Sequence, residues 1–294
     1  MSIGATPAGG AASDLRRPTI EEDLERLRAI ERGSRQRSRA LYPMAAALLG
    51  VAAWYLVILA LRMPDYVLPS PHQVFAELLA APGLFLEHGA VTVSAALGGF
   101  LLSIVIGVPI AVAIAWSDAF GRAIMPFLIF SQTMPKVAIA PLFILWFGFG
   151  LVPKLVIAFL ISFFPVVISM TTGLLAVEGE MLELVRSMSA TKAQTFLKAR
   201  VPTSLPFLFS GLKVSITLCV IGAIVGEFVG ANRGLGYLVL WANGQTETAL
   251  LFAVLVVLAL IGYGLYALVS ALERLLIPWH VAVRSHRELR DFSY

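Results

Sequence analysis

Long apolar runs alternate with short polar interruptions along most of the chain. Six of these runs, at residues 41–61, 91–116, 123–147, 152–174, 205–230 and 249–273, match the roughly 17 to 25 residues that a helix needs to cross a bilayer. The pattern predicts an all-α integral membrane protein with six transmembrane helices and a transmembrane domain over residues 41–280.

Composition supports the same class. Hydrophobic residues make up 59% of the 294 residues and charged residues 14%, and the mean hydropathy is +0.86, whereas a soluble domain carries about 25% charged residues. The net charge of +4 arises from basic residues beside apolar runs, so no nucleic-acid partner is expected. The single cysteine, Cys219, excludes an intrachain disulfide and a CxxC redox motif.

The basic residues define an orientation, because positively charged loops stay in the cytoplasm. With the N-terminus inside, 17 Lys and Arg residues fall on the cytoplasmic side, and only Arg62, Lys154 and Arg233 fall outside. Both termini and the segment 178–206 are therefore predicted to be cytoplasmic. Lys136 and Lys213 lie within or at the edge of runs.

Both ends of the chain are predicted to be cytoplasmic tails. Residues 1–40 form the N-terminal tail, in which 1–18 lack apolar residues for a core and 19–39 have the spacing of an amphipathic helix. Residues 281–294 form the C-terminal tail. A signal peptide is the competing interpretation of the first apolar run, but this run is as long as a span and no small-residue cleavage site follows it.

The polar interruption from Glu178 to Pro206 has helical periodicity. Its apolar residues Leu182, Val185 and Met188 recur among charged ones, which predicts amphipathic helices. Pro202 and Pro206 are expected to end them before the next apolar run. A short helical hairpin on the membrane surface would offer a docking site for a soluble protein.

The third apolar run contains a polar break. Ser131 to Lys136 interrupt it near its middle, and broken helices at membrane depth face protein or a water-filled cavity. Gln132, Pro135 and Lys136 are therefore candidates for the lining of a translocation pathway. The alternative is that the helix ends near Met134 and Lys136 extends to a lipid headgroup.

Glycines surround an acidic residue after the fifth run. Gly230, Gly234 and Gly236 predict a tight turn. Glu227 lies just before it, and two roles remain open for this side chain. It either pairs locally with Arg233, the favoured interpretation, or lines the pathway.

Small residues recur in the second run and predict close helix packing, since packing drives helix association in lipid. These residues are Gly98, Gly99, Ser103, Gly107, Ala111 and Ala115.

Catalytic chemistry is not predicted. The four histidines, His72, His88, His280 and His286, are scattered on both sides of the membrane, so we expect no metal site and no catalytic triad. No phosphate-binding loop of the GxxxxGK[ST] type occurs. If ATP drives this protein, another chain hydrolyses it.

Three stretches carry a resemblance to a known family. They are Leu68-Pro69-Ser70-Pro71 with Val74, Pro135-Lys136 through Ala140-Pro141-Leu142 to Trp146-Phe147-Gly148-Phe149-Gly150, and Gly226-Glu227-Phe228 with Gly230-Ala231 and Gly234-Leu235-Gly236. Over residues 41–280 the chain resembles the permease subunits of bacterial ABC importers, in the nitrate, sulfonate and taurine group. The resemblance implies a type I ABC importer (MetI-like) permease fold in the bacterial inner membrane.

The resemblance also implies a role for the polar segment. In this family a cytoplasmic loop with a Glu-Ala-Ala start, a Gly and a Leu-Pro close forms coupling helices that sit in a groove of the ATPase subunit, here at 178–203. The acidic start and the Gly are missing from the matched positions, and Ser189 stands where the Gly usually lies. The residues implied to couple to the ATPase are Leu184, Val185, Arg186, Ser189, Ala190, Lys192, Phe196 and Pro202.

The implied assembly is a homodimer of this subunit with two ATPase subunits, which bind ATP and Mg, and an external substrate-binding protein. Its substrate would be a small nutrient, either an organic anion such as a sulfonate, taurine or nitrate, or a heterocyclic vitamin precursor. A slight likeness in Pro135–Gly150 favours the heterocycle. The alternative functions are a stand-alone ion-coupled secondary transporter, which calls for buried carboxylates within spans, and a membrane enzyme.

Overall fold

The computed structural model describes residues 42 and 44–278. The predicted helix at 19–39, the C-terminal tail and two of the histidines, His280 and His286, lie outside these residues. Contacts divide the chain into two units, Met1–Arg62 and Met63–Tyr294. In the first unit the structure describes one apolar helix, Met44–Leu61.

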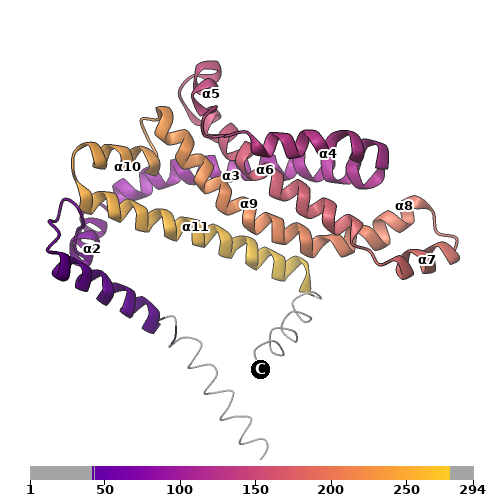
Figure 1. The fold of residues 1–294 in the computed structure, drawn as a ribbon, viewed down its shortest axis with the longest axis horizontal. Helices are drawn as coiled ribbons and strands as arrows, with labels where there is room; N and C mark the ends of the chain where they lie inside the picture. Colours follow the sequence, from indigo (N-terminus) through magenta and orange to yellow (C-terminus); the bar gives the residue numbers. More distant parts are fainter. Residues whose placement is uncertain (1–41, 43, 279–294) are drawn as a thin grey trace, which may run out of the picture. The chain divides into compact units, whose positions relative to one another are not determined.

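The second unit is helical throughout its described part (Figure 1). One or more shorter helices separate each long helix from the next. In chain order they are α2 (Pro71–Ala80), α3 (Pro82–Trp116), α4 (Asp118–Thr133), α5 (Ala140–Phe147), α6 (Leu151–Leu175), α7 (Gly179–Ser187), α8 (Lys192–Thr195), the π-helical turn η1 (Phe196–Arg200), α9 (Val201–Gly230), α10 (Leu235–Gly244) and α11 (Thr248–Leu276).

Five helices in the described part of the chain are long and apolar enough to cross a membrane, which confirms five of the six predicted spans. They are Met44–Leu61, Pro82–Trp116, Leu151–Leu175, Lys192–Gly230 and Thr248–Leu276. The predicted span 123–147 is not a single helix. It is divided into α4 and α5 because Met134 precedes Pro135 and has extended backbone angles (φ −68°, ψ 130°), as steric conflict with a following proline favours.

Helix α6 packs against both α3 and α9 at backbone distance. A Cβ atom placed on Gly99 of α3 would lie 2.6 Å from the Cβ of Ala158, and one on Gly222 of α9 would lie 2.6 Å from the Cα of Ala158. Ser103 and Ser162 join α3 to α6 through a hydroxyl contact of 2.6 Å. The small residues of the second run therefore permit close packing, as predicted.

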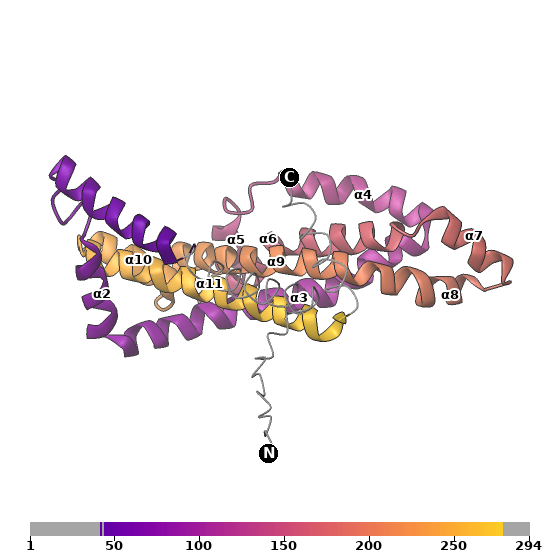
Figure 2. The same ribbon diagram turned by 90° about the horizontal axis from the view of Figure 1, so that it is seen from below.

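Two short helices border the long ones and were not predicted from the hydropathy pattern. Helix α2 begins after Ser70, which forms a capping box with Gln73, and Pro71 occupies its first turn; this start signal is visible in the sequence. Helix α10 follows the glycine turn after α9. Figures 1 and 2 both show α7 and α8 at the end of the bundle where α6 ends and α9 begins, far along the long helices from α10.

The Gly222 contact makes a prediction about stability. Gly222→Ala should destabilise the protein by about 1 to 3 kcal/mol, because the added methyl group meets the backbone of Ala158 and the helices must separate. Thermal unfolding of the full chain in detergent, followed by size-exclusion chromatography, measures the change.

Gly262→Ala on α11 is the matched control. No atom lies within 4 Å of a Cβ at this position, and alanine favours helix by about 1 kcal/mol relative to glycine. Equal melting temperatures for the two variants would contradict the packing argument.

Candidate functional site

The predicted helical hairpin is present in the polar segment after α6. Helix α7 ends at Ser187, and α8 begins at Lys192 after Thr191. Thr191 forms a capping box: its hydroxyl accepts from the amide of Gln194 at 3.2 Å, and its own amide donates to the side-chain oxygen of Gln194 at 2.9 Å. Local sequence therefore determines where the second helix starts.

The turn between the two helices is a Schellman motif centred on Ser189. The amide of Ser189 donates to the carbonyl of Arg186, and the amide of Ala190 donates to that of Val185, which is the hydrogen-bond pattern of this motif. Ser189 has a φ of +55°, a left-handed conformation that glycine adopts more readily. The position at which the family usually has Gly thus keeps the glycine conformation here.

Two acidic side chains precede the matched positions on α7. Glu180 lies in the first turn of this helix, and Glu183 directly precedes Leu184.

The prolines do not end the hairpin, contrary to the prediction. Pro202 lies in the first turn of α9 and Pro206 lies inside it, and the helix is continuous over Lys192–Gly230. The π-helical turn Phe196–Arg200 directly precedes Pro202. Such local widening satisfies backbone groups that a proline would otherwise leave unpaired, which is why the helix continues.

The residues implied to couple lie in four environments rather than on one face. Leu184 is 57% exposed on α7, while Val185 and Pro202 line an apolar groove between α7 and the start of α9. A second pocket, at the end of α3, is lined by Arg186, Ala190, Lys192 and Phe196. Ser189 forms the turn.

The pathway candidates in the third run lie around the break between α4 and α5. Gln132 is exposed on the last turn of α4, and Pro135 is exposed in the turn that follows. The ammonium group of Lys136 lies 4.5 Å from the centre of the Phe164 ring on α6, a cation–π contact. The helix therefore ends near Met134, as the alternative interpretation held, and Lys136 contacts a neighbouring helix.

Glu227 lies in a buried polar cluster at the opposite end of the bundle from the hairpin. It is 1% exposed, and its carboxylate is 3.7 Å from the ammonium of Lys154, which is 4% exposed on α6. Thr92 of α3 donates to the carboxylate at 3.0 Å, and the amide of Gly236 donates to it at 2.7 Å. One carboxylate thereby joins α3, α6, α9 and α10.

The predicted pair between Glu227 and Arg233 is wrong. Arg233 is 71% exposed at its side chain and pairs with Glu87 at 3.4 Å, whereas Glu227 faces the interior between helices. Only the backbone carbonyl of Arg233 takes part in the buried cluster, where it accepts from Lys154 at 2.7 Å.

The glycine turn between α9 and α10, where the sequence predicts a tight turn, packs against this cluster through Gly234 and Gly236. Gly234 has a φ of +124°, and a Cβ atom on it would lie 2.1 Å from the Glu227 carboxylate. Its carbonyl lies 3.0 Å from the Nδ1 atom of His88, and its amide lies 3.1 Å from the same atom. Any side chain at Gly234 would displace the carboxylate.

A second buried ion pair escaped the sequence analysis. Lys213 of α9 pairs with Glu273 of α11, and both side chains are largely buried. Glu273 falls at the last residue of the predicted sixth run, so its burial could not be distinguished from an exposed position at the membrane edge. The apolar residues on both sides of Lys213 were the available signal.

Metal binding has no support in the described part of the chain. Within residues 42 and 44–278, no group of three His, Cys, Asp or Glu side chains could hold a metal ion. Cys219 is fully buried among apolar residues, as expected of a small core residue.

Ser189→Gly should stabilise the hairpin by about 1 kcal/mol, because glycine removes the steric cost of the left-handed conformation. Ser187→Gly, at the last residue of α7, should instead destabilise the hairpin by about 0.5 kcal/mol, because glycine has a lower helix propensity than serine. Hydrogen exchange of the amides in 184–195 measures both changes. Equal protection in the two variants would be inconsistent with the strained conformation of Ser189.

Lys154→Met should destabilise the protein by about 3 kcal/mol, because it leaves the Glu227 carboxylate buried without its cation. Adding Glu227→Gln should recover most of that loss, since no buried charge remains. Thermal unfolding of the two single variants and the double variant forms a double-mutant cycle. Additive losses would show that the pair is not coupled.

Comparison with known proteins agrees with this architecture. Residues 89–279 match the family model described as binding-protein-dependent transport system inner membrane component. The chain is 36% identical to the formylaminopyrimidine transport permease protein ThiX of Halalkalibacterium halodurans, over 82% of this chain and 96% of that protein. It is 38% identical to the riboflavin transport system permease protein RibX of Chloroflexus aurantiacus, over 74% and 82% respectively.

The fold is similar to that of a solved transporter. A chain of the methionine ABC transporter MetNI, in an inward-facing conformation, superposes with a TM-score of 0.54 at 21% identity, over 63% of this chain and 92% of that chain. The predicted MetI-like permease fold is therefore confirmed at the level of the fold. The chain belongs to the binding-protein-dependent transport system inner membrane components, and it is a multi-pass permease subunit of an ABC importer.

Proposed function

We propose that this permease forms a homodimer, binds two ATPase subunits through the α7–α8 hairpin and imports a heterocyclic nutrient delivered by an external binding protein. The observation that carries the proposal is the hairpin itself. Its residue Leu184 is 57% exposed, and its second helix begins the continuous helix Lys192–Gly230, which extends to the Glu227 cluster. Both termini are cytoplasmic in this arrangement, and the ATPase subunits bind the ATP and Mg.

The exposed apolar side chains of α7 are the favoured contact with the ATPase. Leu184 lies on α7, and Met188 directly follows the last residue of this helix. Both apolar side chains are largely exposed. Burial of such side chains against a partner is favourable. Arg186 and Lys192 line a pocket at the end of α3 instead. A substitution of Leu184 therefore tests docking of the ATPase more directly than a substitution of either cation.

The break between α4 and α5 is the favoured lining of the pathway, with Gln132, Pro135 and Lys136 as its candidate residues. Two of them are exposed in the described chain, and a second copy of the subunit would complete a pathway at this level. Glu227 is almost completely buried within one subunit, so we assign it to holding the glycine turn rather than to contact with substrate.

Ion-coupled secondary transport is disfavoured by the buried charges. The carboxylates of Glu227 and Glu273 are both buried in candidate spans, and each is paired with a lysine of another helix. A carboxylate that binds a coupling ion must exchange that ion during transport, whereas these two already have internal partners.

The substrate class rests on the relatives. Two permeases that share 36% and 38% identity with this chain are named for formylaminopyrimidine and riboflavin, both of them heterocycles. A heterocyclic nutrient is therefore preferred over a sulfonate, taurine or nitrate.

Uptake by the reconstituted assembly tests the proposal. The chain, its ATPase subunits and its binding protein are placed in liposomes, and uptake should require internal ATP. Leu184→Asp should reduce the amount of co-purified ATPase and the rate of ATP-dependent uptake at least about tenfold, because it places a charge in an apolar contact. Labelled riboflavin should enter faster than labelled taurine.

Gln245→Asp is the control, since it adds the same charge at an exposed position at the end of α10. Wild-type levels of ATPase bound to Leu184→Asp would refute the docking site. Uptake by the chain alone under an ion gradient would support the secondary transporter instead.

A further inference from the structure

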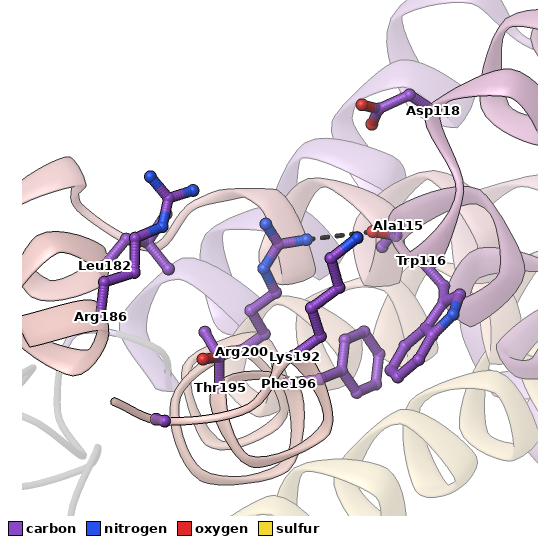
Figure 3. A pocket seen from close by; sticks show the side chains of 10 residues that line it. Ala115, Trp116, Asp118, Leu182, Arg186, Lys192, Thr195, Phe196 and Arg200 are labelled. Atoms are coloured by element: carbon purple, nitrogen blue, oxygen red, sulfur yellow. Dashed lines mark hydrogen bonds between the residues drawn. The ribbon is translucent and has the colours of Figure 1, made fainter. Parts of the chain in front are cut away.

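A basic pocket lies where the hairpin meets the end of α3. Its cavity volume is about 330 Å³, and its walls come from the end of α3, the start of α4, helix α7 and the segment from α8 to η1. This volume is at the lower end of the range of small-molecule sites, roughly 300 to 1,000 Å³. Figure 3 shows its lining side chains.

Three cations and one carboxylate line this pocket. Arg200 donates from its guanidinium group to the carbonyl of Ala115 at 3.0 Å, and Lys192 extends beside it in Figure 3. Arg186 faces the pocket from α7, and Asp118 contributes the single negative charge. Among the ion pairs within the described residues, no carboxylate neutralises Arg186, Lys192 or Arg200.

Like charges that converge in one cavity repel one another, and a bound anion removes this repulsion. Arg200 has a structural role, because it caps a free carbonyl at the C-terminal end of α3. Arg186 and Lys192 have exposed side chains and are available for an anionic group.

The pocket lies at the end of an apolar helix. Ala115 and Trp116 are the last two residues of the candidate span Pro82–Trp116, which is also where the predicted apolar run 91–116 ends. Trp116 packs edge-on against Phe196 with ring centres 5.2 Å apart, so an aromatic pair lies directly beside the cations. Tryptophan is enriched at membrane interfaces.

We propose that the pocket formed around Arg186, Lys192 and Arg200 binds the phosphate headgroup of an anionic phospholipid. The cations contact the phosphate. Trp116 and Phe196 form an apolar wall against which the acyl chains of the lipid pack. The proposal rests on the proposed function for its cytoplasmic orientation, because anionic lipids attract basic pockets at that face. The bound lipid would join α7 to the end of α3 and thereby steady the hairpin.

Native mass spectrometry of the delipidated full-length chain, without ATPase subunits, tests this site. The probes are phosphatidylglycerol, phosphatidylcholine and inorganic phosphate at equal concentrations. Wild-type protein should retain phosphatidylglycerol at least tenfold more tightly than phosphatidylcholine. Arg186→Gln with Lys192→Gln should weaken phosphatidylglycerol binding about 30-fold, because each lost cation removes a surface attraction to the anion.

Arg122→Gln with Lys198→Gln is the matched control, since both residues are on the same side in the predicted topology but outside this pocket. This variant should bind phosphatidylglycerol as the wild type does. Unchanged phosphatidylglycerol binding by the Arg186 and Lys192 variant would overturn the proposal, because these two cations would then have no part in lipid binding. Displacement of the lipid by inorganic phosphate would also overturn it, because the ligand would then be a free anion.

Failure of this site is distinguishable from failure of the proposed function. Lipid binding is measured on the chain alone, so it does not depend on docking of an ATPase. Leu184→Asp should retain the lipid while it loses the ATPase, because Leu184 is not among the residues that line the pocket. Loss of both properties in Leu184→Asp would contradict the separate placement of the two surfaces.

Discussion

The close contact of α6 with α3 and α9 is the constraint on which the rest of the structure depends. In lipid, apolar surface alone does not bring helices together, and small residues that allow backbones to approach are needed. Gly99 and Gly222 meet the same residue, Ala158, from the two neighbouring helices. This contact aligns the three helices along their length. Consequently, the Glu227 cluster can form at one end, and the hairpin can leave α6 and return through α9 at the other.

The two ends of the bundle differ in how they accommodate charged side chains. At the α10 end the charged groups are buried. Lys154 and Glu227 pair with each other, and each also forms a hydrogen bond with a backbone group of the glycine turn. At the hairpin end, charge remains accessible on Arg186 and Lys192. The buried pair favours a fixed geometry at the α10 end, while the accessible charges suit reversible binding of a partner at the hairpin end. The same helices thus have a rigid end and a binding end.

Properties that arise from local or periodic sequence could be predicted. Hydropathy located the span 152–174 close to the observed α6, and the small residues of the second run marked the contact face of α3. The hairpin followed from helical periodicity, whereas the left-handed backbone of Ser189 is a finding of the structure. The break in the third run was also visible, because Pro135 acts on the backbone of its own neighbour.

Properties that depend on distant residues could not be predicted. The partner of Glu227 was taken as Arg233, which is near in sequence, but the observed partner lies on α6 far away along the chain. Only the packing of α6 against α9 brings Lys154 within reach. Likewise, Pro202 was expected to end a helix because its local cost is evident, whereas the π-helical turn that offsets this cost has no sequence signature of its own. The sorting of the coupling residues among separate surfaces required the three-dimensional arrangement of α7 and α8.

The unbroken helix Lys192–Gly230 gives the hairpin a mechanical connection to the far end of the subunit. Its 39 residues span roughly 58 Å at 1.5 Å per residue, so torque applied at Lys192 reaches Glu227 through a single hydrogen-bonded rod. The π-helical turn takes up one residue beyond the ordinary helical repeat, which offsets the two parts of the rod by about 100°. The rotation of the hairpin about the helix axis is therefore not determined by which face of α9 contacts α6. Deleting a residue from this turn would shift the phase of one relative to the other, and it would also displace Phe196 and Arg200 from their contacts with the end of α3.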